Sequence, residues 1–208
     1  KGVLKGRNPA VDAKKISRLD GSKSVVAAPR GHAKSTNFTF KDSLHAALYL
    51  YKHYIIILSD SSDQAEGFLS DIKTEMEDNQ EIRLDFGNQQ GKVWKSTVIL
   101  TTGGVKIEAI GSGKKVRGRR HGAWRPDLLV LDDIENDENV NTPDQRRKLD
   151  SWFKKAVSKA GDTYTDIMYI GTILHYDSLL SNTLKNPEYE SRTYRAVISF
   201  SDRDDLWD

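Results

Sequence analysis

The sequence contains no cysteine, which excludes disulfide bonds and thiolate metal sites and agrees with an intracellular protein. It also has no apolar run that approaches the length of a membrane span, and no signal peptide is visible. An excess of one charge is missing as well, because 32 Lys and Arg residues face 30 Asp and Glu residues and leave a net charge of only +2. The composition as a whole therefore does not indicate a nucleic-acid or membrane partner, and any function must lie in local motifs.

The hydrophobic pattern predicts one α/β domain, for which 208 residues are sufficient, with residues 1–22 as a small helical arm before it. Strands are expected at 25–28, 54–58, 128–132, 165–170 and 191–200, a β-hairpin at 97–110, and helices at 36–51, 63–77, 144–160 and before the last strand. The stretch 78–96 is expected to be irregular. Strands that alternate with helical crossovers indicate a mostly parallel sheet with helices on both faces.

The segment 28–35 lies between a short apolar run and a helix-compatible stretch, as a phosphate-binding loop does between a strand and a helix. Backbone N–H groups of such a loop wrap a β-phosphate, while Lys34 reaches the β- and γ-phosphate oxygens and the Ser35 hydroxyl binds Mg²⁺. We expect nucleotide contacts from eight residues of this region: Pro29, Arg30, Gly31, His32, Ala33, Lys34, Ser35 and Thr36.

The loop departs from the usual pattern G-x-x-x-x-G-K-[ST], because Ala28 and Ala33 occupy the two glycine positions. Gly31 and the small side chains would still allow the backbone to approach a phosphate. The alternative is an ordinary strand-to-helix turn with a surface lysine.

A second motif lies at 127–135, where four apolar residues lead into a run of acids. Such a short apolar run predicts a strand buried on both faces of a parallel sheet, and open α/β sheets bind ligands at the carboxyl ends of their strands. Asp132 is then placed to hold Mg²⁺, directly or through water. Asp133 or Glu135 is placed to polarise an attacking water, since both should leave the strand on the side opposite Asp132. The alternative is a helix-capping cluster on a solvated loop.

A third cluster, at 113–122, places five cations among glycines: Lys114, Lys115, Arg117, Arg119 and Arg120. Glycine-flanked cations suit contacts to DNA phosphates, and an arginine in such a loop can also stabilise charge on ATP during hydrolysis.

In combination these motifs resemble the ATPase domain of the large terminase subunit, the motor that packages DNA into tailed-bacteriophage capsids. The resemblance covers roughly residues 24–175 and rests on the loop at 29–35, on Arg117-Gly118 before 125–135, and on Gly171-Thr172. It implies a P-loop NTPase fold of the ASCE or RecA-like type and Mg²⁺-dependent ATP hydrolysis that drives double-stranded viral DNA into a procapsid. It also implies a homo-oligomeric ring, the portal and the small terminase subunit as partners, and the host cell cytoplasm as the location.

The resemblance assigns roles to single residues. Arg30 would contact the γ-phosphate of its own ATP, and Thr172 would sense that phosphate or position its water. Arg117 would act on the ATP of a neighbouring subunit, because Arg117-Gly118 fits the family pattern best, whereas Lys114, Lys115, Arg119 and Arg120 are expected to bind DNA. The sequence departs from the family at Ala33 and at Asp133, where glutamate is usual, which leaves the water-activating acid open between Asp133 and Glu135. The family's nuclease domain is expected to be absent from this chain.

Two other functions share these motifs. A helicase-like P-loop ATPase would need a second RecA-like lobe, for which 208 residues leave no room. A non-hydrolysing nucleotide- or DNA-binding module with a degenerate loop would explain the two alanines, but the intact Lys34, Ser35 and Asp132 argue against it.

Overall fold

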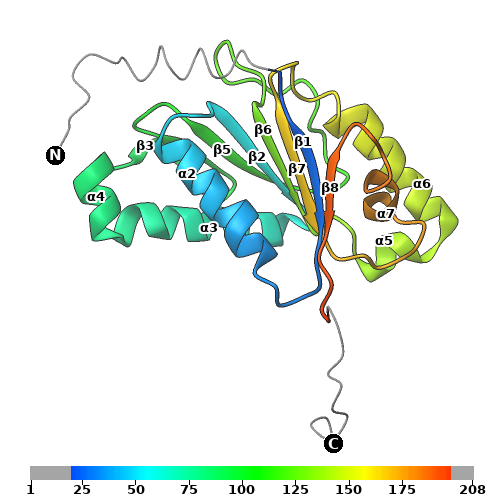
Figure 1. Cartoon of the computed structure of the whole chain (residues 1–208). Helices are drawn as coiled ribbons and strands as arrows, with labels where there is room; N and C mark the ends of the chain where they lie inside the picture. The colour runs from blue at the N-terminus through cyan, green and yellow to red at the C-terminus, as the bar shows by residue number, and fades with distance from the viewer. Residues whose placement is uncertain (1–19, 198–208) are drawn as a thin grey trace, which may run out of the picture.

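The computed structural model describes residues 20–197, which build an eight-stranded sheet in the order β3-β4-β5-β2-β6-β7-β1-β8 (Figure 1). The strands from β5 to β8 in this order are parallel, whereas β3 and β4 extend the sheet as antiparallel strands. Their bounds are β1 (Lys23–Ala27), β2 (Tyr54–Ser59), β3 (Gln90–Trp94), β4 (Val98–Thr101), β5 (Lys106–Gly111), β6 (Leu128–Asp132), β7 (Asp166–Gly171) and β8 (Glu190–Thr193). The predicted α/β class with a mostly parallel sheet is confirmed.

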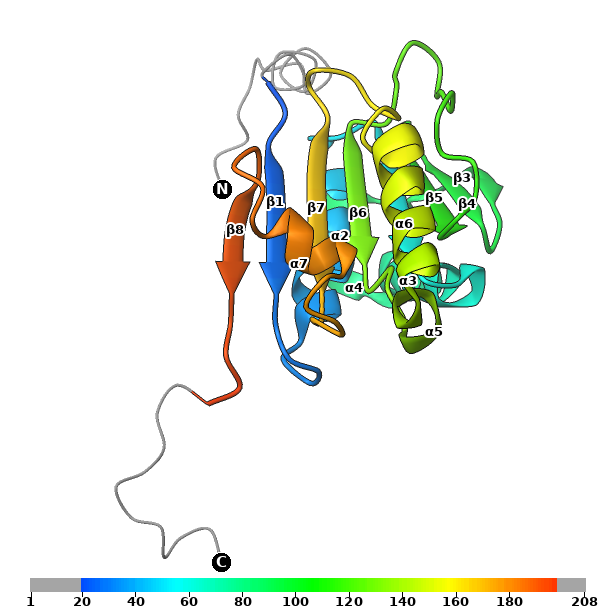
Figure 2. The ribbon, with the colours of Figure 1, turned by 90° about the vertical axis from the view of Figure 1, so that its right-hand side faces the viewer.

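Helices cover both faces of this sheet. The helical segments are η1 (Ser35–Lys41, a π-helix), α2 (Asp42–Leu48), α3 (Ser62–Asp78), α4 (Gln80–Phe86), α5 (Asp137–Asn141), α6 (Pro143–Trp152), η2 (Phe153–Val157, a π-helix) and α7 (Leu179–Thr183). Figure 2 shows α5, α6 and α7 in front of the sheet and α2, α3 and α4 behind it. In the part of the chain from 20 to 197, no helix is both long and apolar enough to cross a bilayer.

The side chains of the central strands alternate between two apolar cores. In β2, Ile55 and Ile57 pack with α2 and α3, whereas Ile56 and Leu58 pack with α6 and α7. Both faces of a central parallel strand are covered, so its sequence is continuously apolar rather than alternating. This is why β2 and β6 are recognisable in the sequence as short apolar runs.

The predicted strands and helices are largely confirmed, with differences where the sequence is polar. The stretch expected to be irregular contains α4 and β3. No residue of α4 is fully buried, although Ile82 packs partly against the core. The helix starts where Asn79 Oδ1 accepts hydrogen bonds from the N–H groups of Glu81 and Ile82. The predicted strand 191–200 is the shorter β8, and residues 198–200 lie outside the described part. Most of the predicted arm, 1–19, also lies outside it.

The chain leaves two neighbouring strands in opposite directions. After β1 it enters η1 and α2, which pack on one face of the sheet, and after β7 it enters α7, which packs on the other face. In open α/β sheets, ligands bind in the crevice that forms where neighbouring strands diverge in this way, at their carboxyl ends. Residues 28–35 and 172–178 follow these two ends.

Candidate functional site

The loop after β1 is curled by two residues with left-handed backbone, Gly31 at φ 78° and Ala33 at φ 52°. It is fixed at its start by the Ala28 N–H, which donates to the Gly171 carbonyl at 3.1 Å, and the helix begins where Asn37 N–H donates to the Ala33 carbonyl. Lys34 has right-handed backbone directly after Ala33, and alternation of this kind turns successive N–H groups into an anion-binding concavity. Ala33 thus adopts the conformation that a glycine would adopt without strain.

Lys34 is buried, with 7% of its surface exposed, so it is not the surface lysine of an ordinary turn. Its Nζ donates to the Thr172 hydroxyl at 2.9 Å and lies 3.6 Å from Oδ2 of Asp133. A buried ammonium is costly unless a carboxylate compensates it, and Asp133 supplies that charge. The structure therefore brings three predicted site residues from three strand ends into contact.

Asp133 faces Lys34 from a position where the backbone no longer has the geometry of a strand. Its φ is 43°, and its N–H donates to the Ile170 carbonyl at 3.0 Å, which keeps it attached to β7. Its Oδ1 accepts the Thr172 N–H at 2.9 Å. A Cβ atom at Gly171 would lie 3.4 Å from that Oδ1 and 3.1 Å from a methyl group of Leu180, so glycine suits this approach.

Asp132 lies at the end of β6 with no exposed surface. Its Oδ2 accepts the Thr39 hydroxyl at 2.5 Å, whereas its Oδ1 is buried and has no hydrogen-bond partner among the described residues. Burial raises the pKa of this carboxyl, and the hydroxyls of Thr39 and Ser35 act against that shift. A bound cation would satisfy the partnerless oxygen and the buried charge.

The donor set fits Mg²⁺ held mainly by a nucleotide. Residues 20–197 contain no group of three or more His, Asp or Glu side chains that could hold a metal alone. Mg²⁺ commonly takes one or two protein ligands and completes its shell with phosphate oxygens and water. Asp132 and the Ser35 hydroxyl would be those protein ligands.

Glu135 is bonded to donors from α7 and β7, and its predicted role in activating water stays a prediction. It is 7% exposed, and its Oε1 accepts the Leu179 N–H at 2.7 Å. Its Oε2 accepts the Leu180 N–H at 2.9 Å and the Tyr169 hydroxyl at 3.1 Å. Burial and the adjacent Glu135 raise the pKa of Tyr169. Asp133 and Glu135 lie on the same side of the sheet, because Asp133 Oδ1 and the ring of Tyr169, to which Glu135 is bonded, both lie within 4 Å of the Cβ position at Gly171, whereas Asp132 contacts Thr39 of η1.

The remaining loop residues lie around the site without contacts that define a role. Arg30, Gly31, His32 and Thr36 are exposed, and the His32 ring nitrogen Nδ1 lies 3.1 Å from the Arg30 carbonyl oxygen. Neither the cis role of Arg30 nor the nucleotide contacts of Pro29 are tested by this arrangement.

The basic segment 113–122 does not form one free surface. Val116 is fully buried in its middle, and the Arg119 guanidinium is bound to the Glu108 carboxylate and, through Nε, to the Lys115 carbonyl at 2.9 Å. Arg119 therefore holds the segment against β5, and its predicted contact with DNA stays a prediction. Arg117 and Arg120 are exposed and form no ion pair with another described residue.

Two contributors to the site were not predicted. Thr39 binds Asp132, and it lies four residues after Ser35, on the same face of a helix, which is a spacing that the sequence displays. Ser59, at the end of β2, donates its hydroxyl to the Asp132 carbonyl at 2.9 Å. No sequence signal distinguishes Ser59 from an ordinary polar residue at a strand end.

A scan of the sequence against protein-family models gives no match, and a search of curated proteins gives none either.

Proposed function

We propose that this protein is a Mg²⁺-dependent ATPase of the P-loop NTPase class and, more specifically, the ATPase domain of a large terminase subunit. The observation that carries the proposal is the contact between Lys34, Thr172 and Asp133, beside a buried Asp132 that has a carboxylate oxygen without a partner. An ordinary strand-to-helix turn gives no reason for a lysine to be buried against an acid from another strand.

The order of the strands supports the class. Strand β7 lies between β1, which leads into the phosphate loop, and β6, which carries the acids. An inserted strand of this kind is a feature of the ASCE type, and here it supplies Thr172 between Lys34 and Asp133.

In the proposed reaction each residue of the site has one task. Lys34 binds the β- and γ-phosphate oxygens, and the backbone N–H groups of 31–34 bind the β-phosphate. Ser35 and Asp132 hold Mg²⁺, which when bound neutralises charge on the phosphates. Asp133 polarises the attacking water, and the Thr172 hydroxyl, which now accepts from Lys34, positions that water or detects the γ-phosphate.

The terminase identity adds partners to this chemistry. Double-stranded DNA is the proposed polymer, the portal and the small terminase subunit are the proposed partners, and the active form is a homo-oligomeric ring in the host cytoplasm. The exposed Arg117, which forms no ion pair within residues 20–197, supports a ring in which an arginine of one subunit completes the site of the next.

The test is ATP hydrolysis by the 208-residue chain at rising protein concentration, with and without Mg²⁺ and with and without duplex DNA. We expect turnover per subunit to require Mg²⁺, to increase with protein concentration, and to rise further with DNA. Absence of both ATP binding and hydrolysis at every concentration would refute the ATPase. Turnover that is independent of concentration and DNA would refute the motor and leave a plain ATPase.

A further inference from the structure

We propose that the outward face of α6 and η2 binds the phosphate backbone of duplex DNA. We define this α6–η2 face by its seven residues: Asp144, Arg147, Lys148, Ser151, Trp152, Lys155 and Ala156. The choice of DNA as partner rests on the proposed function, but the surface itself lies outside the nucleotide site and outside the segment predicted to bind DNA.

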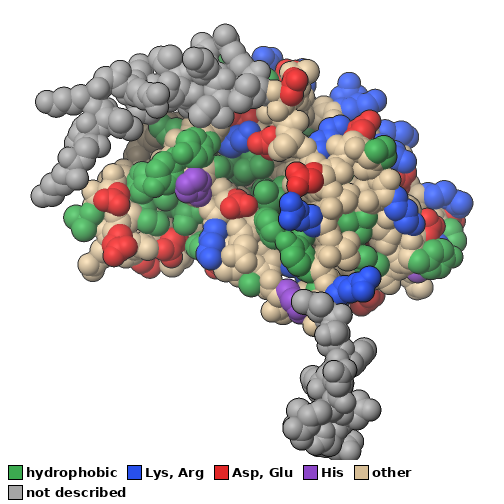
Figure 3. Space-filling model, in the orientation of Figure 1, with side chains coloured by type: hydrophobic (Ala, Val, Ile, Leu, Met, Phe, Trp, Pro, Cys, Tyr) green, Lys and Arg blue, Asp and Glu red, His purple; other side chains and the backbone are tan. Residues whose placement is uncertain are grey.

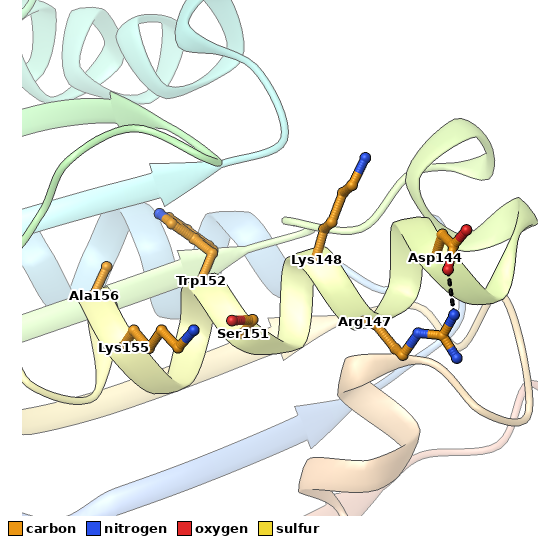
Figure 4. Close-up of a pocket in the computed structure, with 7 residues that line it drawn as sticks. All are labelled: Asp144, Arg147, Lys148, Ser151, Trp152, Lys155 and Ala156. Carbon is orange, nitrogen blue, oxygen red and sulfur yellow. Dashed lines mark hydrogen bonds and ion pairs between the residues drawn. The ribbon is translucent and has the colours of Figure 1, made fainter.

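The α6–η2 face is one continuous side of a helix. Its residues recur at spacings of three and four from one turn to the next, which places them in two neighbouring rows. The opposite side, with Leu149, Phe153 and Val157, is buried in the core. Figure 4 shows Arg147 and Lys148 pointing to different sides of the helix, with the short side chain of Ser151 between the longer ones. Short side chains flanked by long cations leave a hollow that a phosphate backbone can approach closely.

The cations of this face outnumber its own acid, and the acids Asp60 and Glu138 line a separate hollow beside Lys148 and Trp152 without an ion pair to Lys148. Asp144, its one acid, is paired with Arg147. Lys148 and Lys155 are exposed and form no ion pair within residues 20–197, whereas Lys154, on another side of the same helix, lies 2.8 Å from Asp150. Space-filling atoms show Lys and Arg side chains at the right of the molecule, where α6 lies (Figure 3). Unpaired lysines favour DNA binding because they neutralise DNA phosphates and release the counterions condensed on the DNA.

The spacing of the two free lysines suits one strand of DNA. Seven residues separate Lys148 from Lys155, which corresponds to about 10.5 Å along a helix. Phosphates of one strand are spaced by about 3.4 Å along the DNA axis, so two ammonium groups about 10.5 Å apart do not share one phosphate. Each lysine can therefore contact a different phosphate.

Trp152 connects this face with the predicted DNA-binding cations. Its Nε1 donates to the Lys114 carbonyl at 2.8 Å, and its ring packs partly against the core. This bond holds the turn that carries the exposed Lys114 and Lys115 against α6. Trp152 is thus a positioning residue that fixes the backbone of the Lys114 segment beside this face, while the Lys114 ammonium donates to the Ser62 hydroxyl.

The experiment measures binding of a labelled duplex of about 25 base pairs by anisotropy between about 50 and 200 mM salt, a range over which phosphate contacts are resolved. The double variant Lys148→Ala/Lys155→Ala should flatten the slope of log Kobs against log salt by about 1.8, which is 0.9 for each lost phosphate contact. Lys148→Arg/Lys155→Arg should restore the slope. The control is Lys154→Ala, which removes an already paired cation from the same helix and should leave the slope unchanged.

An unchanged slope in the double alanine variant would overturn the proposal, as would equal competition by polyglutamate of the same charge, which would show a general polyanion surface. Trp152→Phe keeps the packing and removes the bond to Lys114, so it should weaken DNA binding without changing basal ATP hydrolysis. ATP hydrolysis without any DNA binding would refute this surface and leave the ATPase standing. A salt slope that depends on the two lysines, without ATP hydrolysis, would support this surface and refute the ATPase.

Discussion

The Lys34 ammonium and the Asp133 carboxylate form an ion pair of 3.6 Å across the carboxyl ends of β1 and β6. In the proposed cycle this pair exists only without a triphosphate, because Lys34 turns to the phosphate oxygens when ATP binds. Asp133 is then left without its cation and becomes a better acceptor for a water proton. The same contact that stabilises the empty site would thus keep Asp133 inactive until substrate arrives.

Lys34→Ala should abolish hydrolysis and most affinity for ATP while the protein remains folded. The side chain contacts only Thr172 and Asp133 through its charge, so its loss removes the phosphate ligand and leaves the apolar cores intact. Isothermal titration with ATP and circular dichroism measure the two outcomes. Lys41→Ala is the matched control, because Lys41 is exposed and bonds only to Asn37. Unchanged ATP binding in Lys34→Ala would refute the site.

Asp133→Asn and Glu135→Gln should differ in their effect on catalysis. Asp133→Asn should stop hydrolysis and retain bound ATP, and it should lower the unfolding temperature of the ATP-free protein because the buried Lys34 loses its counter-charge. Glu135→Gln should lower the free energy of unfolding by about 1–3 kcal/mol, because an amide cannot accept the three hydrogen bonds that the carboxylate accepts from α7 and Tyr169.

Hydrolysis and thermal unfolding are measured on both variants, and turnover is expressed per folded molecule. Loss of turnover in Glu135→Gln with normal unfolding, together with normal turnover in Asp133→Asn, would reverse the assignment.

The sequence predicts the frame of this site because the frame depends on local patterns. Strands β2 and β6 are buried on both faces and are therefore visible as apolar runs, and the parallel sheet follows from their alternation with helices. Parallel strands end at one edge, so Lys34, Asp132 and Thr172 could be expected near one another.

The details that the sequence does not predict depend on backbone conformation and on distant partners. Nothing in residues 132–135 indicates that Asp133 is left-handed or that its carboxylate pairs with Lys34. The hydrogen bonds from the N–H groups of α7 to Glu135 could be predicted only if the position of α7 were known, and α7 lies more than forty residues later in the chain. The pairing of Arg119 with Glu108 could not be predicted, because Glu108 lies in β5, which precedes the basic segment.

Ala33→Gly should stabilise the protein, although it adds flexibility. A left-handed alanine destabilises the folded state by about 1–2 kcal/mol, and glycine would relieve that strain. Part of this gain, about 0.5–1 kcal/mol, is offset because glycine has more conformational entropy to lose on folding. The expected net gain of up to about 1 kcal/mol corresponds to a rise of about 2–4 °C in Tm for a domain of this size. Thermal unfolding by circular dichroism measures it.

Gly31→Ala provides the opposite control at φ 78°, where an added Cβ meets nothing within 4 Å and the cost is purely conformational. It should lower Tm. A shift of both variants in the same direction would contradict the left-handed geometry of the loop.

Asp132→Asn should remove the Mg²⁺ dependence of turnover together with turnover itself, with a smaller loss of ATP affinity. The variant keeps an acceptor for the Thr39 hydroxyl but no longer offers the charged oxygen that lacks a partner. Binding of ATP titrated at several Mg²⁺ concentrations is the measurement. Thr39→Val tests the support of that carboxylate and should weaken the Mg²⁺ dependence less. Full activity in Asp132→Asn would exclude Asp132 as the metal ligand.

Arg117→Ala should bind ATP normally and hydrolyse it slowly, because the proposed role of Arg117 is to stabilise charge on the ATP of a neighbouring subunit, an effect worth roughly 10³–10⁵ in rate. Mixing Arg117→Ala with Lys34→Ala should restore part of the activity, since some interfaces then combine an intact loop with an intact arginine. The control is Arg120→Ala, which changes another exposed arginine of the same segment and should hydrolyse ATP at the normal rate without a second variant.

An arginine that contacts DNA would give a different result. Complementation would fail, and the slope of DNA affinity against salt would flatten by about one phosphate contact. That result would move Arg117 from the neighbour's active site to the DNA surface.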